Sequence, residues 1–280
     1  MKILFATFEL APFTKVGGLA DVMGSLPKYL NPDDLEIAIF TPFIGSIDKT
    51  KYHIKDIQNS KLTMQFGYAQ YVFTLKMCKL PDTNINVFFI DNPKFFSCFN
   101  CVYPAGIDSW YEQERFITFS KSIIEYARLL NFKPDIIHCN DWHTAMIPVW
   151  MKTSYKNDDF FKNTKTVFSI HNLAYQGRYF PEILDFAGIN KEEVYHQYGL
   201  EHYGNLVWMK GALNYSDKII AVSPKYAQEI LTYDFGEGMD WTLRNNQHKL
   251  KGILNGIDYK EYNPETDKSI KYNYNINNIY

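Results

Sequence analysis

The hydrophobic residues of this chain fall into short continuous runs, and longer segments between the runs carry apolar residues at three- and four-residue steps. The runs are rich in β-branched and aromatic residues and predict strands at 2–8, 36–43, 85–91, 134–140, 164–171 and 217–223. The longer segments predict helices at 21–30, 112–130, 142–152, 205–215 and 224–232. In the helix at 112–130, a wide apolar stripe is formed by Phe116, Phe119, Ile123, Tyr126 and Leu130.

This alternation predicts the fold class. Strands that are apolar throughout are usually buried on both faces, and strands that alternate with helices build βαβ units. We therefore expect an α/β fold with a doubly wound, mostly parallel, Rossmann-like sheet. Residues 46–80 differ, because polar and apolar residues alternate there, and they predict a β-hairpin inserted at the sheet edge.

Polar residues capable of chemistry follow the central strands. Glu9 and the Lys15 loop follow the first strand, Asp141 follows the strand at 134–140, and His171 and Asn172 follow the strand at 164–171. Ligands of doubly wound folds bind outside the carboxyl ends of the strands. The sequence therefore predicts a ligand cleft where these side chains meet. For His171, this position favours a functional role over simple packing.

The first strand leads into the stretch "FTKVGGLADVMGSLPKYL", residues 13–30. The adjacent Gly17 and Gly18 allow positive φ and a close approach to a ligand, while the predicted helix start near Asp21 offers free N–H groups to an anion. Lys15 adds a positive charge. The structural alternative is a tight turn with Asp21 as helix N-cap. The stretch is neither a G-x-G-x-x-G nor a Walker loop, so generic nucleotide motifs do not fit.

The stretch "HCNDWH" admits more than one interpretation. His138, Asp141 and His143 could ligate a metal, which would indicate a hydrolase. Alternatively, Asp141 caps the following helix and His143 packs in its first turn. Asn255, in the Asn-Gly turn of "LKGILNGIDYKEYNP", is by itself consistent with a turn at a domain edge.

Composition and charge exclude several classes of partner. The 280 residues carry 29 basic and 31 acidic side chains with no charged run, which gives no reason to expect nucleic acid. No apolar run approaches the roughly 18 residues of a membrane span. Four cysteines are too few for a disulfide scaffold, and one C-x-x-C, Cys98 with Cys101, does not complete a zinc site. With no signal-peptide pattern at the start, a cytoplasmic location is expected.

Five long motifs, in this order, resemble the glycogen synthase and starch synthase family. The matching stretches, between Met1 and about Pro264, are "KVGGLADV", "NDWHTAMIPVW", "HNLAYQG", "MKGALNYSDKIIAVSPKYAQEI" and "LKGILNGID". The resemblance implies a retaining glucosyltransferase that moves glucose from a sugar nucleotide to the non-reducing end of an α-1,4-glucan. The K-x-G-G-L form looks like that of the bacterial enzymes, which generally use ADP-glucose. Neither a metal nor another cofactor is implied.

The resemblance assigns roles to the residues of the glycine loop and to one histidine. Lys15 and the turn at Gly17 and Gly18 would meet the donor phosphates or the adjoining sugar. Asp21 would hold the start of the helix and could contact ligand. His171 would lie at the transferred glucose, where it can hydrogen-bond the 6-hydroxyl and support a cationic transition state.

The remaining cleft residues are assigned in the same way. Asp141 would bind hydroxyl groups of the acceptor or donor, and the cleft would be lined further by Glu9, Asn172 and Asn255. The stretch "GIDSWYEQERF" resembles the family segment that ends in an Arg-Phe pair at the start of a long helix. The aromatic residue of the site is then either Tyr103 or Tyr111.

The resemblance also predicts the domain organisation. Family members continue into a second Rossmann-like domain that supplies most of the nucleotide contacts, including an Arg/Lys pair and a Glu. We therefore expect the N-terminal half of a two-domain GT-B glycosyltransferase, with an acceptor-side domain at 1–255 and an interdomain hinge at 256–280. The second, C-terminal domain would be a partner of this half. The alternative is a glucan-binding module without catalysis.

Overall fold

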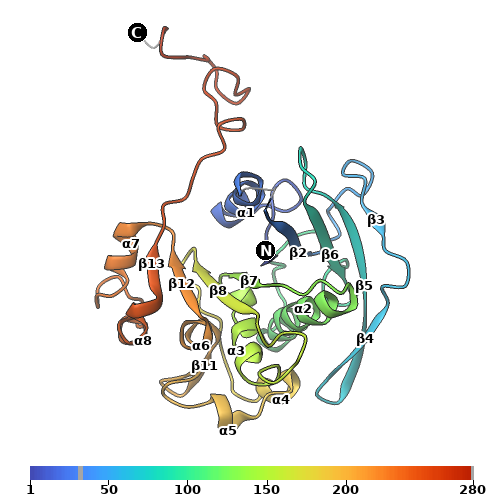
Figure 1. The fold of residues 1–280 in the computed structure, drawn as a ribbon, viewed down its shortest axis with the longest axis vertical. Coiled ribbons are helices and arrows are strands. Elements are labelled where there is room, and N and C mark those ends of the chain that lie inside the picture. Colours follow the sequence, from blue (N-terminus) through green and yellow to red (C-terminus); the bar gives the residue numbers. More distant parts are fainter. Residues whose placement is uncertain (31–33, 279–280) are drawn as a thin grey trace.

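The architecture is described by a computed structural model, which covers residues 1–30 and 34–278. Its main sheet contains parallel strands in the order β6-β2-β1-β7-β8-β12-β13 (Figure 1). From β1 the chain adds β2 and β6 on one side, and it then returns to add β7, β8, β12 and β13 on the other side. This reversal of strand order between β1 and β7 confirms the predicted doubly wound fold. The strands are β1 Lys2–Ala6, β2 Glu36–Pro42, β6 Asn86–Asp91, β7 Ile136–Asn140, β8 Lys165–Ile170, β12 Lys218–Ala221 and β13 Leu250–Gly252.

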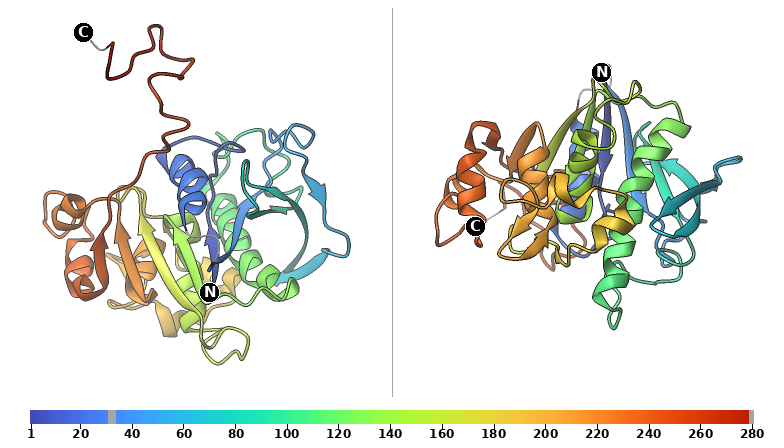
Figure 2. Two further views of the ribbon diagram at one scale, coloured as in Figure 1. Left: turned by 45° about the horizontal axis from the view of Figure 1, so that its top comes forward. Right: turned by 90° about the horizontal axis from the view of Figure 1, so that it is seen from below.

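Helices cover both faces of this sheet (Figure 2). The crossover from β1 to β2 contains α1, whereas those leading to β7, β8 and β12 contain α2, α3 and α6, which contact one another through α3. Because βαβ crossovers are right-handed, the two groups lie on opposite faces. The helices are α1 Gly18–Tyr29, α2 Ser109–Leu129, α3 Met146–Lys152, α4 Ile183–Ala187, α5 Lys191–Val194, α6 Trp208–Tyr215, α7 Pro224–Glu229 and α8 Asp240–Asn245.

Burial explains why the central strands are apolar at every position. Leu4, Phe5 and Ala6 of β1 are at most 1% exposed although successive side chains point to opposite faces. On the α3 and α6 side, Trp150 and Trp208 are fully buried. A large side chain removed from water in this way contributes about 2–3 kcal/mol, so the layer beneath the strand ends is firmly packed.

The predicted edge hairpin is confirmed. β4 (Leu62–Phe66) and β5 (Ala69–Lys79) pair antiparallel around a turn at Gly67, whose φ is +53°. β5 also pairs antiparallel with β6, and the short β3 (Lys55–Asp56) pairs with β5. The insertion therefore extends the sheet on the side away from β13.

Several predicted helix bounds are wrong. The segment 205–215 begins as β11 (Asn205–Val207), which forms a small antiparallel sheet with β10 (Glu201–His202) and β9 (Arg178–Tyr179) before α6 starts. The segment 142–152 starts with a 3₁₀ turn, Trp142–Thr144, ahead of α3. A second 3₁₀ turn, Gln247–Lys249, precedes β13. The remaining helix ends agree with the prediction or differ from it by at most three residues.

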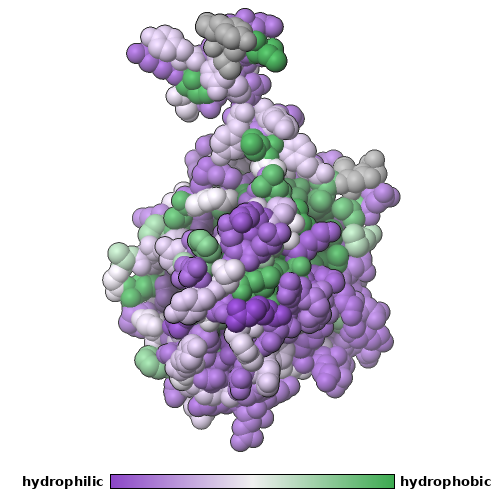
Figure 3. All heavy atoms as spheres, turned by 90° about the vertical axis from the view of Figure 1, so that its left-hand side faces the viewer, coloured by the Kyte–Doolittle hydropathy of each residue, from purple (hydrophilic) through white to green (hydrophobic). Residues whose placement is uncertain are grey.

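Beyond β13 the chain leaves the sheet. Residues 253–278 contain no helix or strand and project from the body (Figure 1). The predicted division at residue 255 stays a prediction, and residues 279–280 of the predicted hinge lie outside the described residues. On the face shown in Figure 3, hydrophobic side chains gather below this projection, whose base carries the exposed Ile253, Leu254 and Ile257. No helix within residues 1–30 and 34–278 is long and apolar enough to cross a membrane.

Candidate active site

A cavity of about 540 Å³ opens at the carboxyl ends of β1, β7 and β8, beside the point where the strand order reverses. Its position is the one that the strand-end pattern predicts for a ligand cleft. Seven of the predicted site residues line it, namely Glu9, Gly17, Gly18, Asp141, His171, Asn172 and Asn255. Lys15 and Asp21 are not among its lining residues.

The glycine loop is held by a carboxylate of the protein. Glu9 Oε2 accepts hydrogen bonds from the backbone N–H groups of Val16 and Gly17, both at 2.9 Å. Gly18 and Leu19, in the first turn of α1, also line the cavity, and their N–H groups have no partner within the helix. The anion-binding capacity predicted for this loop is therefore already used in part by Glu9.

Two expectations about this loop are corrected. The N-cap residue of α1 is Gly17, not Asp21, because the helix starts three residues earlier than predicted. Gly17 has φ −137° and ψ −168°, an extended conformation open to any residue, so positive φ does not explain the glycine. A Cβ added at Gly17 or Gly18 would meet no atom within 4 Å. The feature that the two glycines share is therefore open space beside the cavity.

Lys15 and Asp21 lie next to the cavity and bind each other. Lys15 Nζ is 2.6 Å from Asp21 Oδ1, and about half of the lysine side chain is exposed. The hydrogen bond to Asp21 is the largest influence on the ammonium group and raises the pKa of Lys15. The lysine charge is thus partly balanced in the structure.

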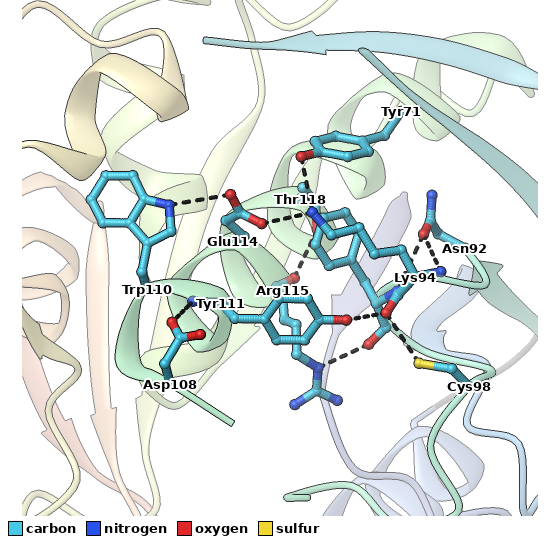
Figure 4. A network of polar contacts seen from close by, with 11 residues as sticks. Tyr71, Asn92, Lys94, Cys98, Asp108, Trp110, Tyr111, Glu114, Arg115 and Thr118 are labelled. Carbon is cyan, nitrogen blue, oxygen red and sulfur yellow. Dashed lines mark hydrogen bonds and ion pairs between the residues drawn. The ribbon is translucent and has the colours of Figure 1, made fainter. Parts of the chain in front are cut away.

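Of the two tyrosines that the sequence offers, Tyr103 lines the cavity and Tyr111 does not. The Tyr103 hydroxyl donates to Glu9 Oε1 at 2.8 Å and lies 2.9 Å from His143 Nε2, so it joins the loop after β6 to the ends of β1 and β7. Burial, followed by the charge of Glu9, raises the pKa of Tyr103 far above its usual range. The alternative, Tyr111, instead donates to the backbone oxygen of Lys94, as Figure 4 shows.

Arg115 fixes the loop that carries Tyr103. This fully buried side chain donates from Nε to the Phe95 oxygen at 2.8 Å and from Nη2 to the Val102 oxygen at 3.2 Å. Figure 4 shows Arg115 within the surrounding polar network. The guanidinium thereby connects the backbone before Cys98 to the backbone after Cys101. All four cysteines of the chain are free.

Asp141 has an unusual backbone and an unusual carboxyl group. Its φ of 54° and ψ of 179° fall in a sparsely populated region, where strain of about 1–3 kcal/mol commonly marks functional sites. Oδ1 accepts from the backbone N–H groups of His171 at 2.8 Å and Asn172 at 3.4 Å. Burial outweighs these bonds and raises the pKa of Asp141 to about 7.

The histidines at the cavity are held neutral. His171 Nε2 lies 3.0 Å from Asn140 Oδ1, and burial lowers the pKa of His171 to about 4. His143 stacks on Phe8, with ring centroids 5.2 Å apart, and burial lowers its pKa to about 3. At pH 7 neither imidazole adds positive charge to the cavity.

The three residues of the metal hypothesis are not brought together. His138 Nε2 lies 2.6 Å from Ser169 Oγ and faces a neighbouring cavity of about 300 Å³ between α1 and the residues after β13. Asp141 and His143 line the cavity at the strand ends instead. Across residues 1–30 and 34–278, no group of three or more His, Cys, Asp or Glu side chains could hold a metal ion.

Comparisons with known proteins agree with this fold. The family described as "Starch synthase catalytic domain" matches residues 2–245. Glycogen synthase of Thermotoga maritima is 43% identical, with 100% of this chain and 57% of that protein covered. Glycogen synthase of Clostridium perfringens is 40% identical, with 100% and 56% covered. The catalytic domain of Starch Synthase IV from Arabidopsis thaliana, bound to ADP and acarbose, superposes with a TM-score of 0.87 at 28% identity, covering 99% of this chain and 56% of that one.

The doubly wound sheet that carries the cavity is shared with the Arabidopsis catalytic domain. The chain belongs to the starch synthase catalytic domain family, which confirms the resemblance found in its motifs. It spans about half the length of the curated relatives it matches.

Proposed function

We propose that this chain is the acceptor-side half of a retaining glucosyltransferase that transfers glucose from ADP-glucose to the non-reducing end of an α-1,4-glucan. The observation that carries the proposal is the convergence of Glu9, Asp141 and His171 on one cavity with the first turn of α1. The choice of ADP-glucose is supported by the K-x-G-G-L form of the loop and by the ADP bound to the Arabidopsis relative.

The proposed chemistry follows from the charges at the cavity. Transfer passes through a cationic, oxocarbenium-like centre, and a site stabilises it best with fixed dipoles and no opposing positive charge. His171, held neutral, supplies a ring nitrogen to the glucose without repelling that centre. Lys15 and the free N–H groups of Gly18 and Leu19 would face the departing diphosphate, and Asp141 would bind sugar hydroxyls.

The proposal extends to the partners and the location. The nucleotide contacts missing from the cavity would come from a C-terminal domain, with the segment from residue 256 as the hinge. We propose that neither a metal nor another cofactor takes part. A cytoplasmic location fits the four free cysteines.

Glucose incorporation from radiolabelled ADP-glucose into glycogen tests the proposal. We expect the 280-residue chain alone to show little or no incorporation, because it supplies only one wall of the site. A fusion of the chain to the remaining C-terminal part of the Thermotoga relative should incorporate glucose. His171→Ala should lower the activity of the fusion by about 100-fold or more, a loss of the size that removal of one transition-state contact causes. Robust incorporation by the chain alone would contradict the half-site proposal.

The second candidate is a glucan-binding module without catalysis. It is favoured by the aromatic side chains at the cavity, Tyr103, Trp142 and Tyr175, since aromatic faces stack on sugar rings. Both an acceptor-side half and a binding module should be retained on a glycogen gel, so the activity of the fusion distinguishes the two functions. For a binding module, Lys15→Ala should leave retention unchanged and the fusion should be inactive.

A further inference from the structure

Asn140, the last residue of β7, is 1% exposed, and both the nitrogen and the oxygen of its side-chain amide are hydrogen-bonded. Nδ2 donates to the backbone oxygens of Ala6 at 3.1 Å and His138 at 3.3 Å. Because carbonyl oxygens only accept hydrogen bonds, this side of the amide must be the nitrogen. The oxygen, Oδ1, is then the atom that lies 3.0 Å from His171 Nε2.

This orientation determines the proton position on His171. An amide oxygen is only an acceptor, so Nε2 of the imidazole must carry the hydrogen that it donates. A neutral imidazole has one N–H and one bare nitrogen, and burial keeps this ring neutral at pH 7. Nδ1 is therefore a hydrogen-bond acceptor on a ring that lies between the two cavities and lines both of them, whereas Asn140 lines only the smaller one.

We propose that Asn140 is a positioning residue that holds His171 as its Nε2–H tautomer, so that Nδ1 accepts a hydrogen bond from a sugar hydroxyl in the cavity. The identity of the sugar rests on the proposed function, whereas the tautomer does not. A sugar with a hydroxyl at this point is accepted. A sugar with a carboxylate there is rejected, because two acceptors would face each other in a buried site.

The backbone around His171 shows that the ring is held from two directions. Asp141 Oδ1 accepts from the His171 backbone N–H at 2.8 Å, while Asn140 fixes the ring. Asn140 also spans the switch point, since Ala6 is the last residue of β1 and pairs with Cys139 of β7. The amide thus links the ends of three neighbouring strands, β1, β7 and β8, at the cavity.

His138 provides an internal comparison. Its Nε2 lies 2.6 Å from the hydroxyl of Ser169, which can donate or accept. Nothing in that contact selects one tautomer, although the same kind of ring lies on the adjacent part of β7. The fixed tautomer is therefore a property of the Asn140 contact and not of histidine burial in general.

The test is ¹⁵N NMR of the 280-residue chain labelled at histidine, with the His171 signals assigned by their loss in His171→Gln. We expect Nδ1 to show the shift of a bare ring nitrogen and Nε2 that of a protonated one. A protonated Nδ1, or an averaged pair of shifts, would overturn the proposal. This measurement needs no ligand and no turnover.

Two variants separate positioning from general packing. Asn140→Ala should move both His171 nitrogen shifts toward an averaged tautomer mixture. Ser169→Ala, which removes the partner of His138, should leave both shifts in place. Unchanged His171 shifts in folded Asn140→Ala would overturn the role of Asn140, and if that variant does not fold, the wild-type shifts decide.

A titration separates this inference from the proposed function. ADP-glucose should shift the Nδ1 signal, and ADP-xylose, which lacks the 6-hydroxymethyl group, should shift it less. An Nε2–H tautomer without any response to ADP-glucose would overturn the sugar contact and count against the proposed function. The positioning by Asn140 would then stand on the tautomer alone.

Discussion

At the scale of single residues, Asp141 shows how burial decides protonation. In the unfolded chain its pKa is near 3.8, and in the folded protein it is about 7. Between about pH 4 and pH 7 the folded protein holds a proton there that the unfolded chain releases. Stability from this group is complete below that window and is lost as the pH rises through 7.

We therefore expect Asp141→Asn, which keeps an acceptor oxygen, to gain stability relative to wild type as the pH rises. The difference in unfolding free energy between the two proteins should grow by about 2.5 kcal/mol from pH 5 to pH 7.5. Burial lowers the pKa values of three histidines, His138, His143 and His171, so these groups make the folded protein less stable as the pH falls below 6.5. This effect is the same in both proteins and does not change the difference between them. Urea unfolding at both pH values measures the difference, and parallel pH dependences would contradict it.

The glycine loop gives a second prediction at this scale. Gly17→Ala should change the unfolding free energy by less than about 0.5 kcal/mol, because φ is negative and the added Cβ meets no atom within 4 Å. It should weaken ADP-glucose binding, because the methyl group occupies space beside the cavity. The control is Gly67→Ala, at φ +53°, which should cost about 1 kcal/mol. Thermal melts with and without ADP-glucose measure both effects.

Three of the site residues that the sequence revealed share one property, which is that they follow a buried strand closely. Glu9, Asp141 and His171 could be found in this way because strand ends meet at one edge of a parallel sheet. The pairing of Lys15 with Asp21 could not, since side-chain partners depend on the loop geometry. Asn140 also escaped, because it looks like the last position of a strand. A polar residue ending an apolar run was the available signal.

At the scale of elements, helix α2 connects the site to the core. Asp108, its N-cap residue, accepts from the Tyr111 backbone N–H at 2.8 Å, and about two turns after the cap Arg115 holds the loop that carries Tyr103. The sequence predicted this helix from its apolar stripe but began it at Glu112, because the cap lies outside the periodic region.

Asp108→Ala should lower the unfolding free energy by about 1 kcal/mol, the usual value of an N-cap. Denaturant unfolding measures the change. Asp234→Ala, at an exposed loop position, is the matched control and should stay within about 0.5 kcal/mol of wild type. Equal losses in the two variants would show that the cap does not stabilise α2.

The segment at 205–215 shows why another element was misplaced. Its apolar residues fit a helical period, but Leu206 pairs with Tyr179 and Glu201 in the small sheet, and the helix starts only at Trp208. Strand pairing with β9 and β10 overrode the local pattern here. The hydrophobic pattern of this segment alone does not show which strands it pairs with.

At the scale of the whole molecule, alternation of strands and helices was enough to predict a doubly wound sheet, and the motifs were enough to predict the family. The path of the chain after β13 was not predictable, because it depends on contacts outside any regular element. Asp258, 5% exposed, accepts from the Tyr29 hydroxyl at 3.0 Å and lies 3.7 Å from Lys28. These contacts attach the departing segment to the end of α1.

Asp258→Ala should release that segment from α1. The backbone N–H groups of Glu261 and Tyr262 donate to the backbone oxygen of Asp258 at 3.1 and 2.8 Å, and they should then exchange with deuterium several-fold faster. Hydrogen exchange read by mass spectrometry measures this, with Asp234→Ala as the control. Unchanged exchange at residues 256–263 would show that the attachment does not order the segment.

Helix α1 touches both regions at once. Its first turn lines the cavity, and Lys28 and Tyr29 in its last turn bind Asp258 in the segment after β13. Twelve helical residues form a stiff rod about 18 Å long. One helix therefore joins the cavity to the segment after β13, so a ligand that displaced the first turn of α1 would also displace the point where that segment is attached.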